Sequence, residues 1–442
     1  MKCFPRSNSQ LLTWFLLAGV LVHPVVFSGE PNGSSAPSAS VVIADYIEGY
    51  KADLDTLDHR YRIPLDNESA ELRATTMQDW LERLGKVNFE SLERPNQIDY
   101  LLLKSEIQYQ LAKQQLDRYR DQQAAKFLPY ATALVGFCKN REDVLPIEAD
   151  LVAEKLDATA TAIEDLVGTL VSLDDGAQSD ADVQRRLDAL RAAELVGSLS
   201  RWVREAHGFY NGYDPQYSWW CDKPMERLNK ALDRHRTALR EKIVGVPESD
   251  NDTIIGLPIG KEGLALELQH EWIAHDPAEL VKLAEREMAW CDEQMRLASQ
   301  ELGCGDDWRK AMELVKSRHV APGEQPKMIR DLAWEAIHFL EAHDLVTVPP
   351  LAANGWRMTM MSPERQRVNP YFLGGDTIIV SFPTDEMTHS EKLMSMRSNN
   401  EHFSRATVHH ELIPGHHLQY YMLARHRPYR SLFNTPFWIE GW

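Results

Sequence analysis

Apolar residues recur every three or four positions from about residue 41 to about residue 302 of this 442-residue chain, and this spacing limits its fold more than any other feature. Proline- and glycine-containing loops separate the stretches that show it, which cover 46–62, 69–85, 95–124, 142–173, 180–207 and 224–243. No repeat of fixed period accompanies them. Helices that each carry one apolar face bury it against one another. The spacing therefore predicts a mainly α fold with a large helical domain.

The clearest helix start is at Asp276. Its carboxylate can accept hydrogen bonds from free backbone amides of the first turn, Pro277 needs no amide there, and Glu279 can close a capping box. One face of the expected helix then carries five apolar residues: Leu280, Ala284, Met288, Cys291 and Met295.

One segment, 377–382, predicts a strand, because it is rich in β-branched residues, follows Gly374 and Gly375, and ends at Pro383. The fold should therefore include a small β element. The strand could offer a free edge to an extended peptide, or it could be a short strand of the core.

The N-terminus has the parts of a secretion signal. Residues 1–28 combine Lys2 and Arg6 with an apolar run and end in small residues, and 29–40 are rich in Pro, Gly, Ser and Ala. We expect cleavage after the signal, a flexible linker over 29–40, and export to the periplasm or medium without a membrane anchor. A net charge of −18 disfavours nucleic acid as a partner.

Four cysteines remain beyond the signal: Cys138, Cys221, Cys291 and Cys304. Their wide spacing specifies no disulfide pairing and matches no metal-binding pattern, so buried free thiols are as compatible with it as disulfides. Four aromatic residues, Tyr213, Tyr217, Trp219 and Trp220, could line a cleft, but we expect them to be buried by packing.

Residues 409–417 read HHELIPGHH and follow a segment that could begin a helix near Asn400. Two imidazoles and a neighbouring carboxylate are what a hydrolytic zinc site uses as ligands and base. In an unbroken helix, however, His410 and His416 would lie about 9 Å apart along the axis, and His410 and His417 about 10.5 Å apart. The helix must deform for either pair to share an ion.

Pro414 and Gly415 provide the means of that deformation. Proline cannot donate to the carbonyl of His410 and clashes with it, and glycine adopts backbone angles that other residues avoid. A turn there could return His416 or His417 to His410. The spacing alone leaves both histidines open as the second ligand.

From His410 to Gln419 the sequence resembles the bacterial metallopeptidase-like family known as domain of unknown function 885, which is marked by His-Glu, two residues and Pro-Gly-His-His-Leu-Gln. A helical N-terminal part, PIGKEG at 258–263 and a later Glu-Gly-Trp also have counterparts here. Members look like relatives of the gluzincins, zinc peptidases whose third ligand is a glutamate on a later helix. The resemblance implies zinc ligands His410, His416 and Glu440, with Glu411 as general base.

The resemblance also implies one metallopeptidase domain over 41–442, with a helical N-terminal part at 41–260 and a catalytic part at 261–442. Because members of the family continue past the Glu-Gly-Trp that ends here, we expect the catalytic part to be truncated and this chain to bind zinc weakly and turn over slowly. A downstream oxyanion-stabilising residue would then be missing.

The same residues are also compatible with purely structural roles. The histidines could form a structural cluster, Glu440 could be a carboxylate at a helix start after Pro436, and His402 and His409 are better suited to packing or to supporting the ligands. The leading interpretation is a zinc-dependent peptidase acting on peptides or small proteins. The alternative is an exported helical protein that binds metal or peptide without hydrolysing it.

Overall fold

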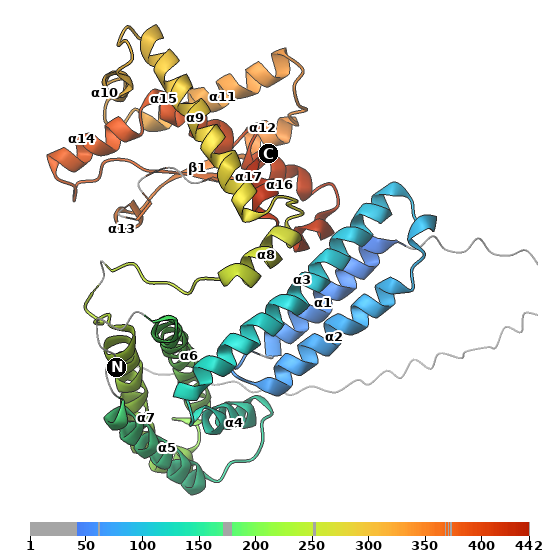
Figure 1. Ribbon diagram of the computed structural model, residues 1–442, viewed down its shortest axis with the longest axis vertical. Helices are drawn as coiled ribbons and strands as arrows, with labels where there is room; N and C mark the ends of the chain where they lie inside the picture. The colour runs from blue at the N-terminus through green and yellow to red at the C-terminus, as the bar shows by residue number, and fades with distance from the viewer. Residues whose placement is uncertain are drawn as a thin grey trace, which may run out of the picture. The chain divides into compact units, whose positions relative to one another are not determined.

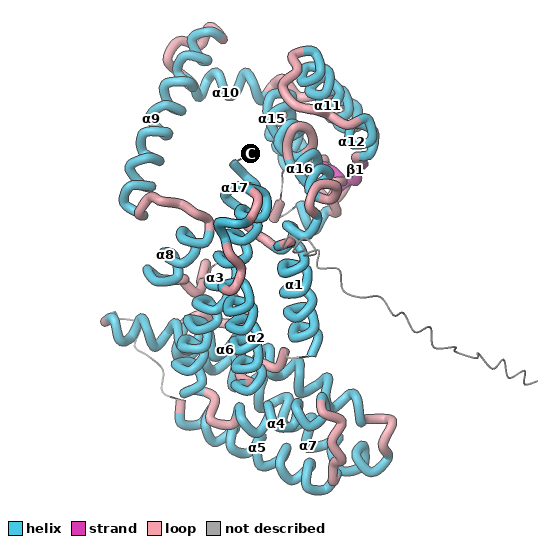
Figure 2. Tube along the Cα trace, turned by 90° about the vertical axis from the view of Figure 1, so that its right-hand side faces the viewer, coloured by secondary structure: helices cyan, strands magenta, loops and turns pink. Residues whose placement is uncertain are grey.

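The computed structural model describes residues 42–60, 62–170, 179–250, 253–366, 368–369, 371 and 374–441. Helices dominate this part of the chain, and its two strands have four residues each (Figure 2). The mainly α fold expected from the apolar spacing is therefore confirmed. None of the helices in these ranges is both long and apolar enough to cross a bilayer. The predicted signal (1–28) and linker (29–40) lie outside the described residues.

Seven long helices form the first half of the described chain (Figure 1). They are α1 (Ile43–Arg60), α2 (Asn67–Gly85), α3 (Arg94–Ala124), α4 (Ala131–Glu142), α5 (Ala149–Thr169), α6 (Asp180–Tyr210) and α7 (Pro215–Ala238), with short helical turns η1 (Phe89–Ser91), η2 (Ala125–Phe127) and η3 (Leu239–Val244). Each of the six predicted segments coincides with one of them. The segment 142–173 corresponds to α5 alone, and α4 was not predicted.

Two hydrophobic cores hold these helices. Helices α4 to α7 enclose one core, which includes the buried Tyr217 and Cys221. Helices α1 to α3 enclose another, which also receives Tyr429, Leu432 and Phe433 from near the C-terminus. The C-terminal segment is thus packed against the N-terminal helices.

The second half has shorter elements. They are α8 (Gly260–His270), α9 (Pro277–Glu301), α10 (Trp308–Lys316), α11 (Gln325–Ala342), α12 (Pro350–Gly355), β1 (Arg357–Met360), α13 (Pro363–Gln366), β2 (Thr377–Val380), α14 (His389–Ser398), α15 (Glu401–Glu411), α16 (His416–Leu423), η4 (Pro428–Leu432) and α17 (Pro436–Gly441).

The predicted strand forms as β2 and pairs in parallel with β1, which was not predicted. Arg357 lies opposite Thr377 in the register. Ile378 and Val380 of β2 are fully buried and pack with Val408 and Leu412, at the end of α15. The small sheet thereby supports the helix that carries the histidine segment.

Helix α9 begins as predicted. The Asp276 carboxylate accepts the Glu279 N–H at 2.8 Å, and the Glu279 carboxylate accepts the Asp276 N–H at 3.1 Å. Its apolar face is not part of a core, because Met288 is 63% exposed and Ser299 is the one buried residue of this fully described helix.

The expectation that the four aromatic residues are buried is wrong for three of them. Tyr217 is fully buried, but Tyr213, Trp219 and Trp220 are 82%, 83% and 51% exposed. The reason is helical phase: Tyr217 and Cys221, four residues apart on α7, face the core, and the two tryptophans between them face solvent.

All four cysteines are free. Cys138 and Cys221 are buried, Cys291 is exposed and Cys304 is partly exposed. Burial raises the pKa of the Cys221 thiol to about 11, so this residue behaves as a small apolar side chain in its core.

Candidate metal centre

The histidine segment is a helix, a turn and a second helix. Helix α15 starts directly after Asn400, near the expected position, because the Asn400 side chain caps it by accepting the N–H groups of His402 and Phe403. It ends at Glu411, and α16 starts at His416. Between them the Ile413–Pro414 peptide bond is cis, and the Gly415 N–H donates to the His409 carbonyl at 3.0 Å.

This turn requires glycine at position 415. A Cβ there would lie 2.7 Å from the His409 carbonyl oxygen and would overlap the carbonyl group of His410. Because Gly415 has none, the turn folds directly against the end of α15. The rings of His410 and His416 consequently meet edge to face, with centroids 4.6 Å apart and planes inclined by 73°.

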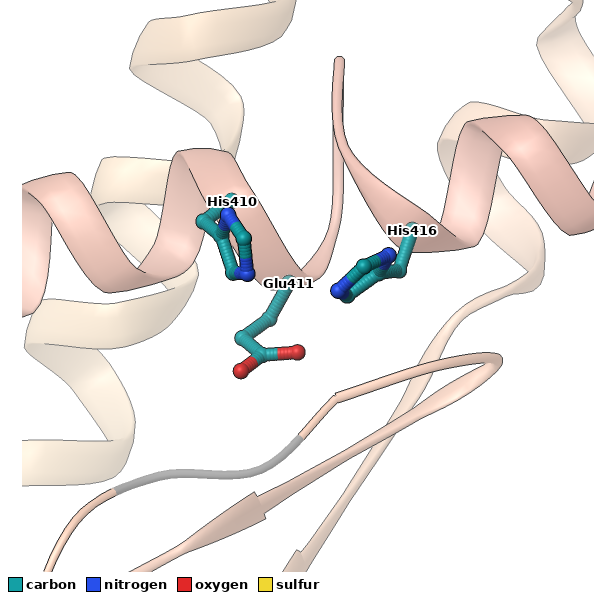
Figure 3. Close-up of side chains that lie close together, drawn as sticks. All are labelled: His410, Glu411 and His416. Atoms are coloured by element: carbon teal, nitrogen blue, oxygen red, sulfur yellow. The ribbon is translucent and has the colours of Figure 1, made fainter. Parts of the chain in front are cut away.

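Three polar side chains converge beside the turn. His410, Glu411 and His416 each place a potential ligand atom within 4.8 Å of the others, and Figure 3 shows the two rings and the carboxylate close together beside the turn. Glu440 of α17 joins them: His410 Nε2 is 3.2 Å from Glu440 Oε2, and His416 Nε2 is 3.5 Å from Glu440 Oε1. Both imidazoles therefore meet one carboxylate that comes from 24 residues after His416.

Glu440 does not occupy the start of its helix. Helix α17 has no acidic residue in its first turn, since Glu440 is its fifth residue. The alternative of a helix-start carboxylate therefore does not fit the position of this residue. Gln419 connects Glu440's helix to His416: its Nε2 donates to the Ile439 carbonyl at 3.1 Å, and its Oε1 lies 3.4 Å from His416 Nδ1.

Glu411 is held in a cradle made by Gly374. A Cβ at Gly374 would lie 2.8 Å from the Glu411 Cα and would overlap the Glu411 side chain. Burial raises the pKa of the Glu411 carboxyl above its ordinary range; the nearby His410 and His416 and the Gly374 N–H, which donates to the carboxylate, oppose that shift. Of the two carboxylates, Glu411 and Glu440, Glu411 is the one against which the backbone of a glycine packs closely.

The other histidines of the segment point elsewhere. His417 is buried, and its Nε2–H donates to the Ala352 carbonyl at 3.0 Å. His409 is partly buried, and burial, together with Arg405, lowers the pKa of its imidazole. His402 is exposed. The structure thus brings His416 to His410, and leaves His417 in a packing role.

The observed spacing fits a zinc ion. With bonds of about 2.0–2.2 Å and tetrahedral angles, two ligand atoms of one zinc lie about 3.3–3.5 Å apart. The two separations between imidazole nitrogen and carboxylate oxygen, 3.2 and 3.5 Å, lie within about 0.1 Å of that range. The Glu440 side chain is 61% exposed and that of His410 is 47% exposed, so solvent reaches the ligand atoms, as an open hydrolytic position requires.

The sequence alone assigns no role to three residues that support the site. Gly374 precedes the predicted strand, and Gln419 is the last residue of the motif, three positions after His416 and so on the same helix face. Glu271, which accepts a hydrogen bond from Trp438 of α17, lies far from Glu440 in the sequence and has no local signal.

Comparison with known proteins identifies a family and a similar fold. A family model described as "Bacterial protein of unknown function (DUF885)" matches residues 48–442. No curated protein matches. A solved structure of a candidate lipoprotein of unknown function from Shewanella oneidensis is similar, with 15% sequence identity and a TM-score of 0.58 over 91% of this chain and 76% of that chain. At this identity the likeness concerns the fold.

Proposed function

We propose that this chain, which belongs to the DUF885 family of bacterial proteins of unknown function, is a zinc-dependent metallopeptidase that hydrolyses peptide bonds of peptides or small proteins. His410, His416 and Glu440 would hold the zinc ion, and Glu411 would act as general base. The observation that carries the proposal is the meeting of two imidazole Nε2 atoms at one distant carboxylate, at 3.2 and 3.5 Å.

A plain surface ion pair accounts less well for this arrangement. An exposed carboxylate paired with histidines stabilises a protein by about 0–1 kcal/mol. That gain does not explain a turn in which Gly415 has no room for a Cβ, or a second glycine, Gly374, packed against the neighbouring carboxylate. A metal site with an adjacent base accounts for both features, because the turn brings the two histidines together and Gly374 lets the carboxylate of the base pack beside them.

Each residue has a definite task in the proposed reaction. Zinc bound there supplies a water of lowered pKa and polarises the scissile carbonyl. Glu411 removes the proton from the attacking water and delivers it to the leaving amine. The Gly374 N–H fixes the direction of the Glu411 carboxylate, and burial raises the pKa of that carboxyl toward the range in which a base also returns its proton.

The test is mass spectrometry of a peptide mixture incubated with the zinc-loaded chain. The proposal expects new product termini that disappear with Glu411→Gln, although that variant still binds one zinc ion. Glu401→Gln is the matched control, because Glu401 begins the same helix and pairs with Arg405 at 3.2 Å, away from the cluster. It should leave product formation unchanged.

Zinc binding without any product termini would favour the alternative, an exported protein that binds metal or peptide without hydrolysis. A chain that retains no zinc would contradict the peptidase and a metal-binding role alike.

We also propose that the protein is exported. This rests on the charged, apolar and small-residue parts of 1–28. The Shewanella oneidensis protein is itself described as a candidate lipoprotein. N-terminal sequencing of the protein from the producing cells should find the chain beginning near residue 29, and an intact Met1 in the cytoplasm would contradict export.

A further inference from the structure

The helix that carries Glu440 is too short to hold its own position. Helix α17 spans six residues, Pro436–Gly441, and none of them is buried. Isolated helices of this length are unstable in water, so their geometry depends on outside contacts. The place of the Glu440 carboxylate must therefore be set by whatever anchors α17.

One buried residue, Glu271, provides two of those anchors. At the start of α17 Pro436 has no N–H, and the amides of Trp438 and Ile439 both donate to the Thr435 carbonyl at 3.1 Å. The amide of Phe437 donates to the Glu271 carboxylate. The Trp438 indole Nε1–H also donates to the Glu271 backbone carbonyl, at 2.7 Å.

Glu271 is itself firmly placed. It is 3% exposed and follows α8 directly, with its N–H donating to the Glu267 carbonyl at 3.0 Å. The preceding residue, His270, lies 3.5 Å from the buried Glu106 of α3 and stacks on Tyr109 at 4.0 Å between ring centroids. The support of α17 therefore leads back to the long helix α3.

We propose that Glu271 is a positioning residue for Glu440: by binding the start of α17 through its carboxylate and its carbonyl, it holds the third zinc ligand against His410 and His416. The inference rests on the proposed metal site. Residues that orient metal ligands typically contribute about 10–100-fold to metal affinity. We expect Glu271→Ala to weaken zinc binding by about tenfold or more, because the Phe437 N–H loses its acceptor.

Zinc affinity, measured by competition with a chelating dye at neutral pH, tests this directly. The second readout is the visible spectrum of the cobalt-substituted protein, which reports ligand geometry and does not respond to a loss of stability alone. Glu271→Gln retains a carbonyl oxygen that can accept from Phe437, so it should stay within about threefold of the wild type. Glu262→Ala is the matched control, because Glu262 is an exposed glutamate in the first turn of α8 and its loss leaves Glu271 and its contacts in place.

Each possible outcome either supports or overturns the inference. Weak binding and an altered cobalt spectrum in Glu271→Ala, with near wild-type values in Glu271→Gln and Glu262→Ala, support the inference. Wild-type affinity and spectrum in a folded Glu271→Ala overturn it while leaving the metal site intact. If that variant does not fold, Trp438→Phe, which removes the indole bond to Glu271, decides: unchanged zinc binding overturns the inference and weaker binding supports it. Absence of zinc binding in the wild type would instead refute the proposed function.

Discussion

Gly374→Ala should separate catalysis from metal binding. The added Cβ would lie 2.3 Å from the Glu411 Cβ, whereas ordinary contacts of this kind are 3.4–4 Å. Glu411 and the loop must therefore separate by about 1.1–1.7 Å, the difference between those distances. A misplacement of about 1 Å at a reacting group costs on the order of 100-fold in rate, or about 2.7 kcal/mol of barrier. The three atoms nearest to the new methyl group all belong to Glu411 and none to a ligand histidine.

The assay is the initial rate of peptide cleavage, followed by product quantification, together with a zinc titration. We expect the rate to fall by about 100-fold and the zinc affinity to stay within about twofold. Gly355→Ala is the matched control, since nothing lies within 4 Å of a Cβ there. A Gly374→Ala protein that cleaves at the wild-type rate would refute the role assigned to Glu411 and its cradle.

Two further outcomes follow from contacts of the site, and a third from His235, which is buried on α7. His416→Ala should abolish zinc binding, whereas His417→Ala should retain zinc and lose about 1–3 kcal/mol of stability in a denaturant titration, because a buried carbonyl loses its donor; the reverse pattern would exchange their roles. Gly415→Ala should weaken zinc binding strongly in a titration, since its Cβ overlaps the His410 carbonyl, and unchanged affinity would contradict the required turn. Burial lowers the pKa of His235 to about 4, so between pH 6.5 and 4 the unfolded state binds more protons and stability should fall by about 3 kcal/mol as pH falls through this window; His235→Gln should flatten that part of the stability curve, and an unchanged slope would refute this assignment.

Local features of the chain were predictable from the sequence. The helical spacing located α1 to α3 and α5 to α7, and the capping residues located the starts of α9 and α15, because these signals act within a few positions. Strand β1 was missed, since RMTM is short and acquires its form from pairing with β2. The tryptophans of α7 were misjudged because an aromatic side chain does not by itself indicate which helix face is buried.

The site was predictable in its residue types and only partly in its geometry. The spacing required a bend at Pro414 and Gly415. His416 and His417, six and seven residues after His410, fitted the spacing equally well as second ligand until the turn was known. Burial of His417 against α12 separates the two. Contacts from remote elements, such as Gly374 to Glu411 and Glu271 to α17, depend on tertiary packing and leave no pattern in the sequence.

The most direct test of the central claim is X-ray absorption at the zinc edge of the metal-loaded protein. The account predicts one zinc ion per chain with only nitrogen and oxygen ligands at about 2.0–2.2 Å and outer-shell scattering from two imidazoles. Glu440→Gln should change the oxygen part of that shell, and His410→Ala should remove one imidazole. A shell that contains sulfur, or one that these substitutions leave unchanged, would contradict it.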